Sequence, residues 1–131
     1  MKTRMIAAIT IVVREYDEAI AWFTGALGFV VREDTDLGNG KRWVRVAPSS
    51  SCETSILLAR ADGEAQLERV GDQTGGRVAL FLYTDDFARD HRRMVEQGVV
   101  FHASPRTEPY GTVVVFEDLY GNRWDLIEPR T

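Results

Sequence analysis

A pattern of strand, helix, glycine and strand occurs twice in this chain, and this repeat limits the folds that the chain can adopt. In the first copy the apolar residues 9–13 precede an amphipathic stretch, residues 18–27, that ends at Gly28. The second copy has the same order and reaches Gly98, 70 residues after Gly28. Solenoid repeats have periods of about 20–50 residues. The longer offset therefore predicts two related modules, with the groove between them as the place for a site.

Each copy extends to a βαβββ module. Runs rich in β-branched residues and turn residues predict the strands, and apolar residues at helical spacing predict the helices, each of which ends at a glycine. Asp17 is the expected N-cap of the first helix. The expected elements are strands 6–13, 29–34, 41–47 and 54–61 with helix 18–27, and then strands 78–83, 99–103, 112–117 and 123–128 with helix 86–97.

The pattern predicts one α+β domain made of two modules that are joined by a polar, glycine-containing linker. The linker is expected to contain one irregular helical turn near residues 65–69. The expected divisions are a domain at 1–131, module 1 at 5–61, the linker at 62–76, module 2 at 77–129, a hairpin turn at 36–40 and a loop at 105–110.

Composition excludes several classes of function. The net charge is −4 and no long basic run is present, which argues against a nucleic-acid partner. The single cysteine, Cys52, excludes an intramolecular disulfide and fits a reducing compartment. No apolar run approaches the length of a membrane span, and residues 1–13 are too short and too strand-like for a signal peptide. We therefore expect a cytoplasmic protein with no membrane partner.

The last hairpin of the chain carries a family resemblance. Residues 116–126 read Phe-Glu-Asp-Leu-Tyr-Gly-Asn-Arg-Trp-Asp-Leu, which resembles the terminal hairpin of the vicinal oxygen chelate superfamily. That superfamily includes glyoxalases, bleomycin resistance proteins and ring-cleaving dioxygenases. Residues 11–29 also look like its opening strand and helix. The resemblance implies a curved mixed sheet that encloses a cup, with both helices on the convex side. It specifies the reaction only weakly, because one fold hosts many functions.

The resemblance also implies a test for metal. Metal-dependent members carry histidines on the first and fifth strands and a carboxylate on the eighth. In this sequence those positions fall on Ala8, on Ala79 (or Val78 in a register shifted by one) and on Asp125. Alanine has no donor atom, and one carboxylate alone does not hold zinc or iron. We therefore expect no metal and no other cofactor.

Strand alternation predicts which side chains line the cup. The lining combines aromatic and apolar groups with a few charges, which suits a flat organic compound with one or two polar groups. Alternatives to a binding role stay open. In these, Arg123 and Glu117 form only an ion pair at the rim of the cup, and Trp43 and Tyr83 belong to the core or to a subunit interface. Tyr110 is either a lid over the cup or an ordinary turn residue. The expected ligand-binding residues are Thr10, Trp43, Arg45, Phe81, Tyr83, Tyr110, Val115, Glu117, Arg123 and Asp125.

The function expected from these residues is metal-independent binding of an aromatic or amphipathic small molecule, in a cup associated with a homodimer. The alternative is a lyase or dioxygenase-like enzyme of the same superfamily that acts on a small oxygen-bearing substrate. Asp125 beside an arginine is then the best catalytic candidate, as an acid–base group. A third possibility is a regulatory module without a ligand. The two alanines at the metal positions favour the binding protein over the enzyme.

Overall fold

A computed structural model describes residues 3–131 of the chain. The chain forms two compact units, Met1–Val70 and Gly71–Thr131. Each unit contains one βαβββ module and one four-stranded sheet. A short helix, α2 (Glu64–Arg69), follows the first module and includes the helical turn that the sequence predicts near residues 65–69.

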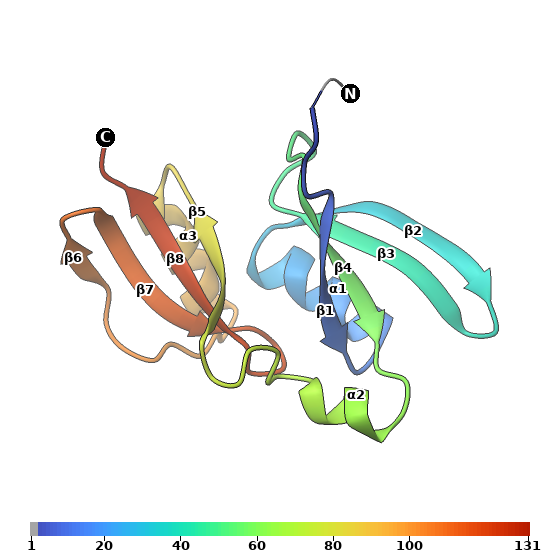
Figure 1. Ribbon diagram of the computed structural model, residues 1–131. Helices are drawn as coiled ribbons and strands as arrows, with labels where there is room; N and C mark the ends of the chain where they lie inside the picture. The colour runs from blue at the N-terminus through green and yellow to red at the C-terminus, as the bar shows by residue number, and fades with distance from the viewer. Residues whose placement is uncertain (1–2) are drawn as a thin grey trace. The chain divides into compact units, whose positions relative to one another are not determined.

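The first unit is a mixed sheet with one helix packed on one face. Its strands are ordered β1-β4-β3-β2, with β1 parallel to β4 and the other pairs antiparallel. Figure 1 shows α1 along one face of this sheet, where it contacts β2, β3 and β4. Phe23 of the helix is buried together with Ile11, Val44 and Leu58 of the sheet. The elements are β1 (Ala8–Val13), α1 (Tyr16–Ala26), β2 (Val30–Gly38), β3 (Lys41–Ala47) and β4 (Ser55–Arg60).

The turn between β2 and β3 is shorter than the sequence predicts. The expected turn covers residues 36–40, but the strands continue to Gly38 and resume at Lys41. Asn39 and Gly40 alone make the turn, with φ of 56° and 76°. Asn-Gly favours a two-residue hairpin because both residues tolerate positive φ, and such a turn matches the twist of the flanking strands.

The predicted cap of α1 is wrong. The helix begins at Tyr16, so Asp17 lies inside its first turn, and Glu15 occupies the N-cap with an extended backbone and no side-chain cap bond. The Asp17 carboxylate instead accepts a hydrogen bond from Arg42 Nη1 at 2.8 Å. Arg42 also packs over the Tyr16 ring, so tertiary contacts, rather than a local cap, hold this end of the helix.

The second unit repeats the arrangement. Its strands are ordered β5-β8-β7-β6, with β5 parallel to β8 and the other pairs antiparallel. Helix α3 packs against β8, and the buried residues include Met94, Phe116 and Leu126. Asp86 caps α3 by accepting a hydrogen bond from the Arg89 backbone N–H at 3.1 Å. The elements are β5 (Val78–Tyr83), α3 (Phe87–Glu96), β6 (Arg106–Glu108), β7 (Gly111–Glu117) and β8 (Arg123–Pro129).

The sixth strand differs from its prediction. Residues 99–103 were expected to be a strand and residues 105–110 a loop, but β6 is Arg106–Glu108. In the earlier segment Phe101 makes only an isolated bridge with Phe116. Pro105 lacks a backbone N–H and cannot donate to the ladder, so regular pairing with β7 starts after it. The strand edge therefore carries Arg106 and Glu108, which the sequence reading left in a loop.

The turn between β7 and β8 is held by a buried carboxylate. Asp118 accepts hydrogen bonds from the backbone N–H groups of Tyr120 and Asn122, from Asn122 Nδ2 and from Trp124 Nε1, all at 3.0–3.1 Å. Burial raises the pKa of Asp118, while these hydrogen bonds oppose the rise. Four donors on one carboxylate fix the turn and the start of β8, the strand that carries Asp125.

The α+β class with two βαβββ modules is confirmed. The eight strands form two four-stranded mixed sheets, and α1 and α3 pack on them as the repeat predicts. Within residues 3–131, no helix is long and apolar enough to cross a membrane.

Candidate functional site

Each unit has one sheet face that its helix does not cover. In β3, Val44 and Val46 are fully buried, whereas Trp43 and Arg45, which alternate with them, point to the opposite face. Trp43 is 40% exposed. Thr10 lies on the same face, because Thr10 and Arg45 are both register partners of Leu57 on β4. The first unit thus brings together three of the predicted ligand-binding residues.

Arg45 is already engaged within its own sheet. Its Nε donates to Glu33 Oε1 at 3.0 Å, and its Nη1 donates to Ser55 Oγ at 3.0 Å. Ser55 is buried, and its hydroxyl accepts from Arg45 while it donates to the Ala7 carbonyl at 3.4 Å, so this buried polar group is satisfied. The sequence reading missed Glu33 and Ser55, since neither belongs to a motif and only the register places them beside Arg45.

The uncovered face of the second unit is richer in aromatic surface. Phe81 is 62% exposed and Tyr83 is 69% exposed, although both lie in the middle or at the end of a regular strand. Their register partners on β8 are Asp125 and Ile127. Trp124 stacks on Phe116 within the core, so the alternation of β8 directs Asp125 to the face of Phe81. Large aromatic rings left in water on a sheet face favour a binding role.

Asp125 lies at the centre of this face. It is 9% exposed, and its neighbours in the register are Phe81 on β5 and Val115 on β7. Its Oδ1 atom is buried and has no hydrogen-bond partner among the described residues. Burial raises the pKa of the Asp125 carboxyl, and the positive charge of Arg106 opposes part of the rise. A buried acceptor without a donor is uncommon in proteins.

Charged groups border the same face. Arg106 Nε donates to Glu108 Oε1 at 2.9 Å, and Arg106 also hydrogen-bonds Tyr110, the residue proposed as a lid. Glu117 is paired with His102, whose Nε2 lies 2.8 Å from Glu117 Oε2. Arg123 is the register partner of Glu117 and is exposed.

Among the predicted residues, the structure groups six on this second face: Phe81, Tyr83, Val115, Glu117, Arg123 and Asp125. Arg106, Glu108 and His102 join them without having been predicted as ligand contacts. Arg106 and Glu108 were missed because their segment looked like a loop. The alternation that places Asp125 beside Phe81, however, follows directly from the sequence pattern.

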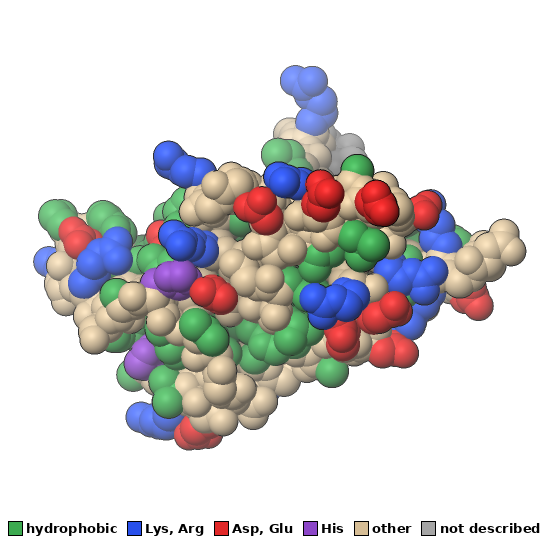
Figure 2. Space-filling model, turned by 90° about the horizontal axis from the view of Figure 1, so that it is seen from below, with side chains coloured by type: hydrophobic (Ala, Val, Ile, Leu, Met, Phe, Trp, Pro, Cys, Tyr) green, Lys and Arg blue, Asp and Glu red, His purple; other side chains and the backbone are tan. Residues whose placement is uncertain are grey.

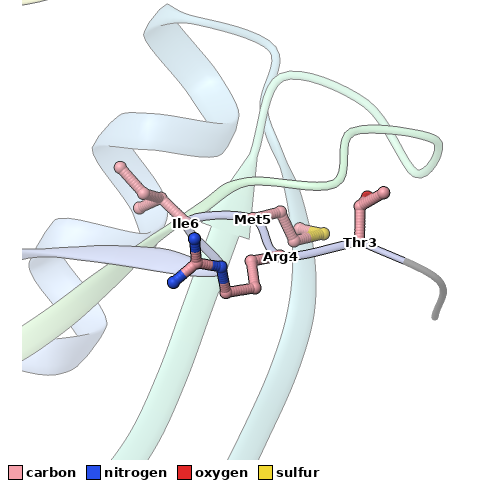
Figure 3. A pocket seen from close by; sticks show the side chains of 4 residues that line it. All are labelled: Thr3, Arg4, Met5 and Ile6. Carbon is pink, nitrogen blue, oxygen red and sulfur yellow. The ribbon is translucent and has the colours of Figure 1, made fainter.

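One surface hollow is lined by Glu117 and Arg123 of this face together with the segment 71–77, Gly121 and Asn122. Another opens at the N-terminal segment and is lined by Thr3, Arg4, Met5 and Ile6 (Figure 3). These four side chains come from one stretch of chain and include no aromatic ring and no acid. Figure 2 shows acidic and basic side chains mixed with hydrophobic ones, without a broad field of one sign on the visible face. We therefore take the Asp125 face, defined by Phe81, Tyr83, Val115 and Asp125, as the candidate site.

The residues at the family's metal positions do not fit a metal. Ala8 and Ala79 offer no donor atom, and a register shift between Val78 and Leu80 places Val78, also without a donor, opposite Arg123. In the described part of the chain, no three His, Cys, Asp or Glu side chains gather to hold an ion. His102 is committed to Glu117, and His91 lies between the rings of Phe87 and Phe101.

Comparisons with known proteins agree with the fold. A protein of Shewanella frigidimarina (strain NCIMB 400), itself uncharacterized, is 51% identical over 124 residues, covering 94% of this chain and 92% of that protein. The crystal structure of UcmS2 superposes with a TM-score of 0.82 at 29% identity, covering 98% of this chain and 99% of that one. TnmS3 from Streptomyces sp. CB03234, described as an antibiotic binding protein, gives a TM-score of 0.78 at 27% identity, covering 99% of both chains.

The family model extends over almost the whole chain. It matches residues 5–126, which include both modules and the hairpin around Asp118. The chain belongs to the glyoxalase/bleomycin resistance protein/dioxygenase superfamily.

Proposed function

We propose that the protein is a binding protein of the bleomycin resistance type. It binds a flat aromatic or amphipathic organic compound without a metal ion. The observation that carries the proposal is the Asp125 face, where exposed aromatic rings of β5 lie beside a buried carboxylate on β8. The bound compound would stack on Phe81 and Tyr83 and direct a polar group to Asp125. TnmS3, which is similar over 99% of both chains, is described as an antibiotic binding protein and supports this class of function.

The energetics favour such a ligand. Burying an aromatic side chain contributes about 1.5–3 kcal/mol, and a stacked ring pair adds about 0.5–1.5 kcal/mol. Phe81 and Tyr83 together expose enough ring surface to provide several kcal/mol on binding.

Metal independence follows from the donor set. The carboxylate of Asp125 is the only one of the three family positions that offers a metal-binding atom, since the others are Ala8 and Ala79 or Val78. A catalytic zinc or iron site requires at least three protein ligands. The proposed binding therefore depends on side-chain surface rather than on coordination.

The proposal is tested by a thermal-shift screen of flat aromatic compounds against protein dialysed with EDTA, followed by fluorescence titration of the hits. Phe81→Ala should weaken a hit about tenfold or more, since about 1.4 kcal/mol is one decade of affinity. Val95→Ala removes an exposed apolar side chain from α3 and is the matched control. Hits that need added metal, or equal affinity in both variants, would overturn the proposal.

A second candidate function is a metal-independent enzyme of the same superfamily. The observation that favours it is Asp125, because a carboxyl with a raised pKa inside an aromatic site suits proton transfer. Mass spectrometry of each hit after prolonged incubation separates the two functions. A binding protein returns the compound unchanged, whereas an enzyme returns a product that Asp125→Asn fails to form.

A further inference from the structure

We propose that Asp125 selects, among flat aromatic compounds, those that present an N–H or O–H donor to its Oδ1 atom. The inference rests on the proposed function and adds a ligand class to it. A compound bound against Phe81 and Tyr83 would meet Asp125 at the register position next to Phe81. A donor on the ring edge would complete the hydrogen bonding that the fold leaves open, whereas a compound without a donor would bury the carboxylate more deeply.

The first argument is the state of the carboxylate in the protein itself. Asp125 is more than nine-tenths buried, and its Oδ1 finds no donor within residues 3–131. A buried acceptor without a partner destabilises the protein, and does so more strongly when it carries charge. A ligand that supplies the missing donor recovers this cost as binding free energy.

The second argument is a comparison with the other buried aspartate of the same hairpin. Asp118 accepts four hydrogen bonds from its own turn, including those of Asn122 Nδ2 and Trp124 Nε1. The hairpin can therefore satisfy a buried carboxylate fully where the carboxylate serves the fold. Asp125 lies seven residues later, and its Oδ1 has no such donor among the described residues. Hydrogen bonding within the fold therefore gives no reason for a carboxylate at this position.

The third argument comes from the repeat. Asp125 lies on β8, between the parallel strand β5 and the antiparallel strand β7. In the first unit the corresponding strand is β4, and the residue between Thr10 and Arg45 on the uncovered face is Leu57. The same architecture thus accepts an apolar side chain at this position. A carboxylate there has to be explained by something other than the βαβββ fold.

The surrounding charges favour a donor over an anion. Arg106 is the cation that acts on Asp125, but its Nε is held by Glu108 at 2.9 Å. Glu117 on β7 brings a further carboxylate to the face and is paired with His102. An anionic group placed beside Asp125 would meet the like charge of that carboxylate, and like charges at short range disfavour binding.

Three naphthalene derivatives test the selection. 2-Naphthol offers an O–H donor, 2-methoxynaphthalene has the same ring without a donor, and 2-naphthoate carries an anion. Fluorescence titration of EDTA-treated protein at neutral pH should give 2-naphthol an affinity at least about tenfold higher than that of 2-methoxynaphthalene, equivalent to about 1.4 kcal/mol. The affinity for 2-naphthoate should be the lowest of the three.

Variants assign the preference to Asp125. Asp125→Ala removes the acceptor, so the preference for 2-naphthol over 2-methoxynaphthalene should disappear. Asp85→Ala removes an exposed carboxylate just before α3 and should keep the preference unchanged. Circular dichroism confirms that both variants fold. If Asp125→Ala does not fold, Asp125→Leu provides the second variant without an acceptor, because Leu57 holds the corresponding position of the first unit, and it should likewise abolish the preference.

The outcomes separate this inference from the proposed function. Failure of all three naphthalenes, together with failure of the wider aromatic screen, would contradict the proposed function. Binding of the three compounds with equal affinity, or a preference for 2-methoxynaphthalene or 2-naphthoate, would overturn the selection by Asp125 and leave aromatic binding in place. A preference for 2-naphthol that persists in Asp125→Ala would overturn it as well.

Discussion

At the scale of residues, the two buried aspartates of the last hairpin have opposite relations to the fold. Asp118 is 5% exposed and fully supplied with donors, whereas Asp125 is 9% exposed and its Oδ1 has none in the described chain. The resemblance of the last hairpin covers both residues and places Asp125 at the family's carboxylate position. It does not reveal which one is satisfied, because that depends on the positions of individual donors.

We predict that removing the two carboxylates changes stability in different directions. Asp118→Ala should lower the free energy of unfolding by about 3 kcal/mol or more, because it leaves Asn122 and Trp124 with buried donors that lack an acceptor. Asp125→Ala should leave it unchanged within about 1 kcal/mol or raise it. Urea unfolding followed by circular dichroism measures both. A larger loss for Asp125→Ala than for Asp118→Ala would contradict the contrast.

The pH dependence of stability has a definite sign. Burial raises the pKa of Asp125 in the folded state above its ordinary value of 3.8. The folded state then binds more protons than the unfolded state in that window, so stability from this group falls as pH rises from about 4 through the folded-state pKa. Asp125→Asn removes the effect. The stability of Asp125→Asn relative to the parent protein, measured by urea unfolding, should therefore increase between pH 4 and pH 7; a constant difference would argue against the raised pKa.

At the scale of elements, the sequence predicts periodic segments well and edges poorly. Both long helices, both glycine stops and the central strands follow from periodicity, with Gly28 and Gly98 at φ of 68° and 76°. The start of α1 and the position of β6 do not. Arg42, which binds Asp17, comes from a strand distant in the sequence. Regular pairing of β6 with β7 starts only after Pro105. Neither effect can be predicted from a short stretch of sequence around the element.

The two helix starts give a matched prediction. Asp86→Ala should lower the free energy of unfolding by about 1 kcal/mol, because the Asp86 side chain caps α3 through the Arg89 N–H. Asp17→Ala removes an exposed carboxylate that is not a cap, and its ion pair with Arg42 should contribute at most about 1 kcal/mol. Urea unfolding of both variants checks this. A greater cost for Asp17→Ala would favour the predicted cap over the observed one.

At the scale of the whole molecule, the repeat gives two similar units that differ in their uncovered faces. The first face carries Trp43 with an Arg45 that is bound to Glu33, and the second carries Phe81 and Tyr83 around Asp125. Alternation predicted which residues share a face within each unit. The partners of Arg45, Arg106 and Glu117 could not be predicted, because they depend on register and side-chain geometry.

We propose that the chain forms a homodimer. Ile6 and Ile9 of the N-terminal strand region are exposed, and apolar side chains on strand surfaces favour association. Analytical ultracentrifugation at micromolar concentration should give a mass of about twice the 14.8 kDa chain. A mass of a single chain across that range would contradict the proposal without affecting the binding face.

The central claim is that a flat aromatic compound binds the Asp125 face without metal. It is tested most directly by NMR chemical-shift mapping of isotope-labelled protein in EDTA, titrated with the best hit of the aromatic screen. The account predicts perturbations that centre on Phe81, Tyr83, Val115 and Asp125 and that saturate in the absence of metal. Perturbations that appear only after metal is added, or that centre on residues outside this face, would contradict it.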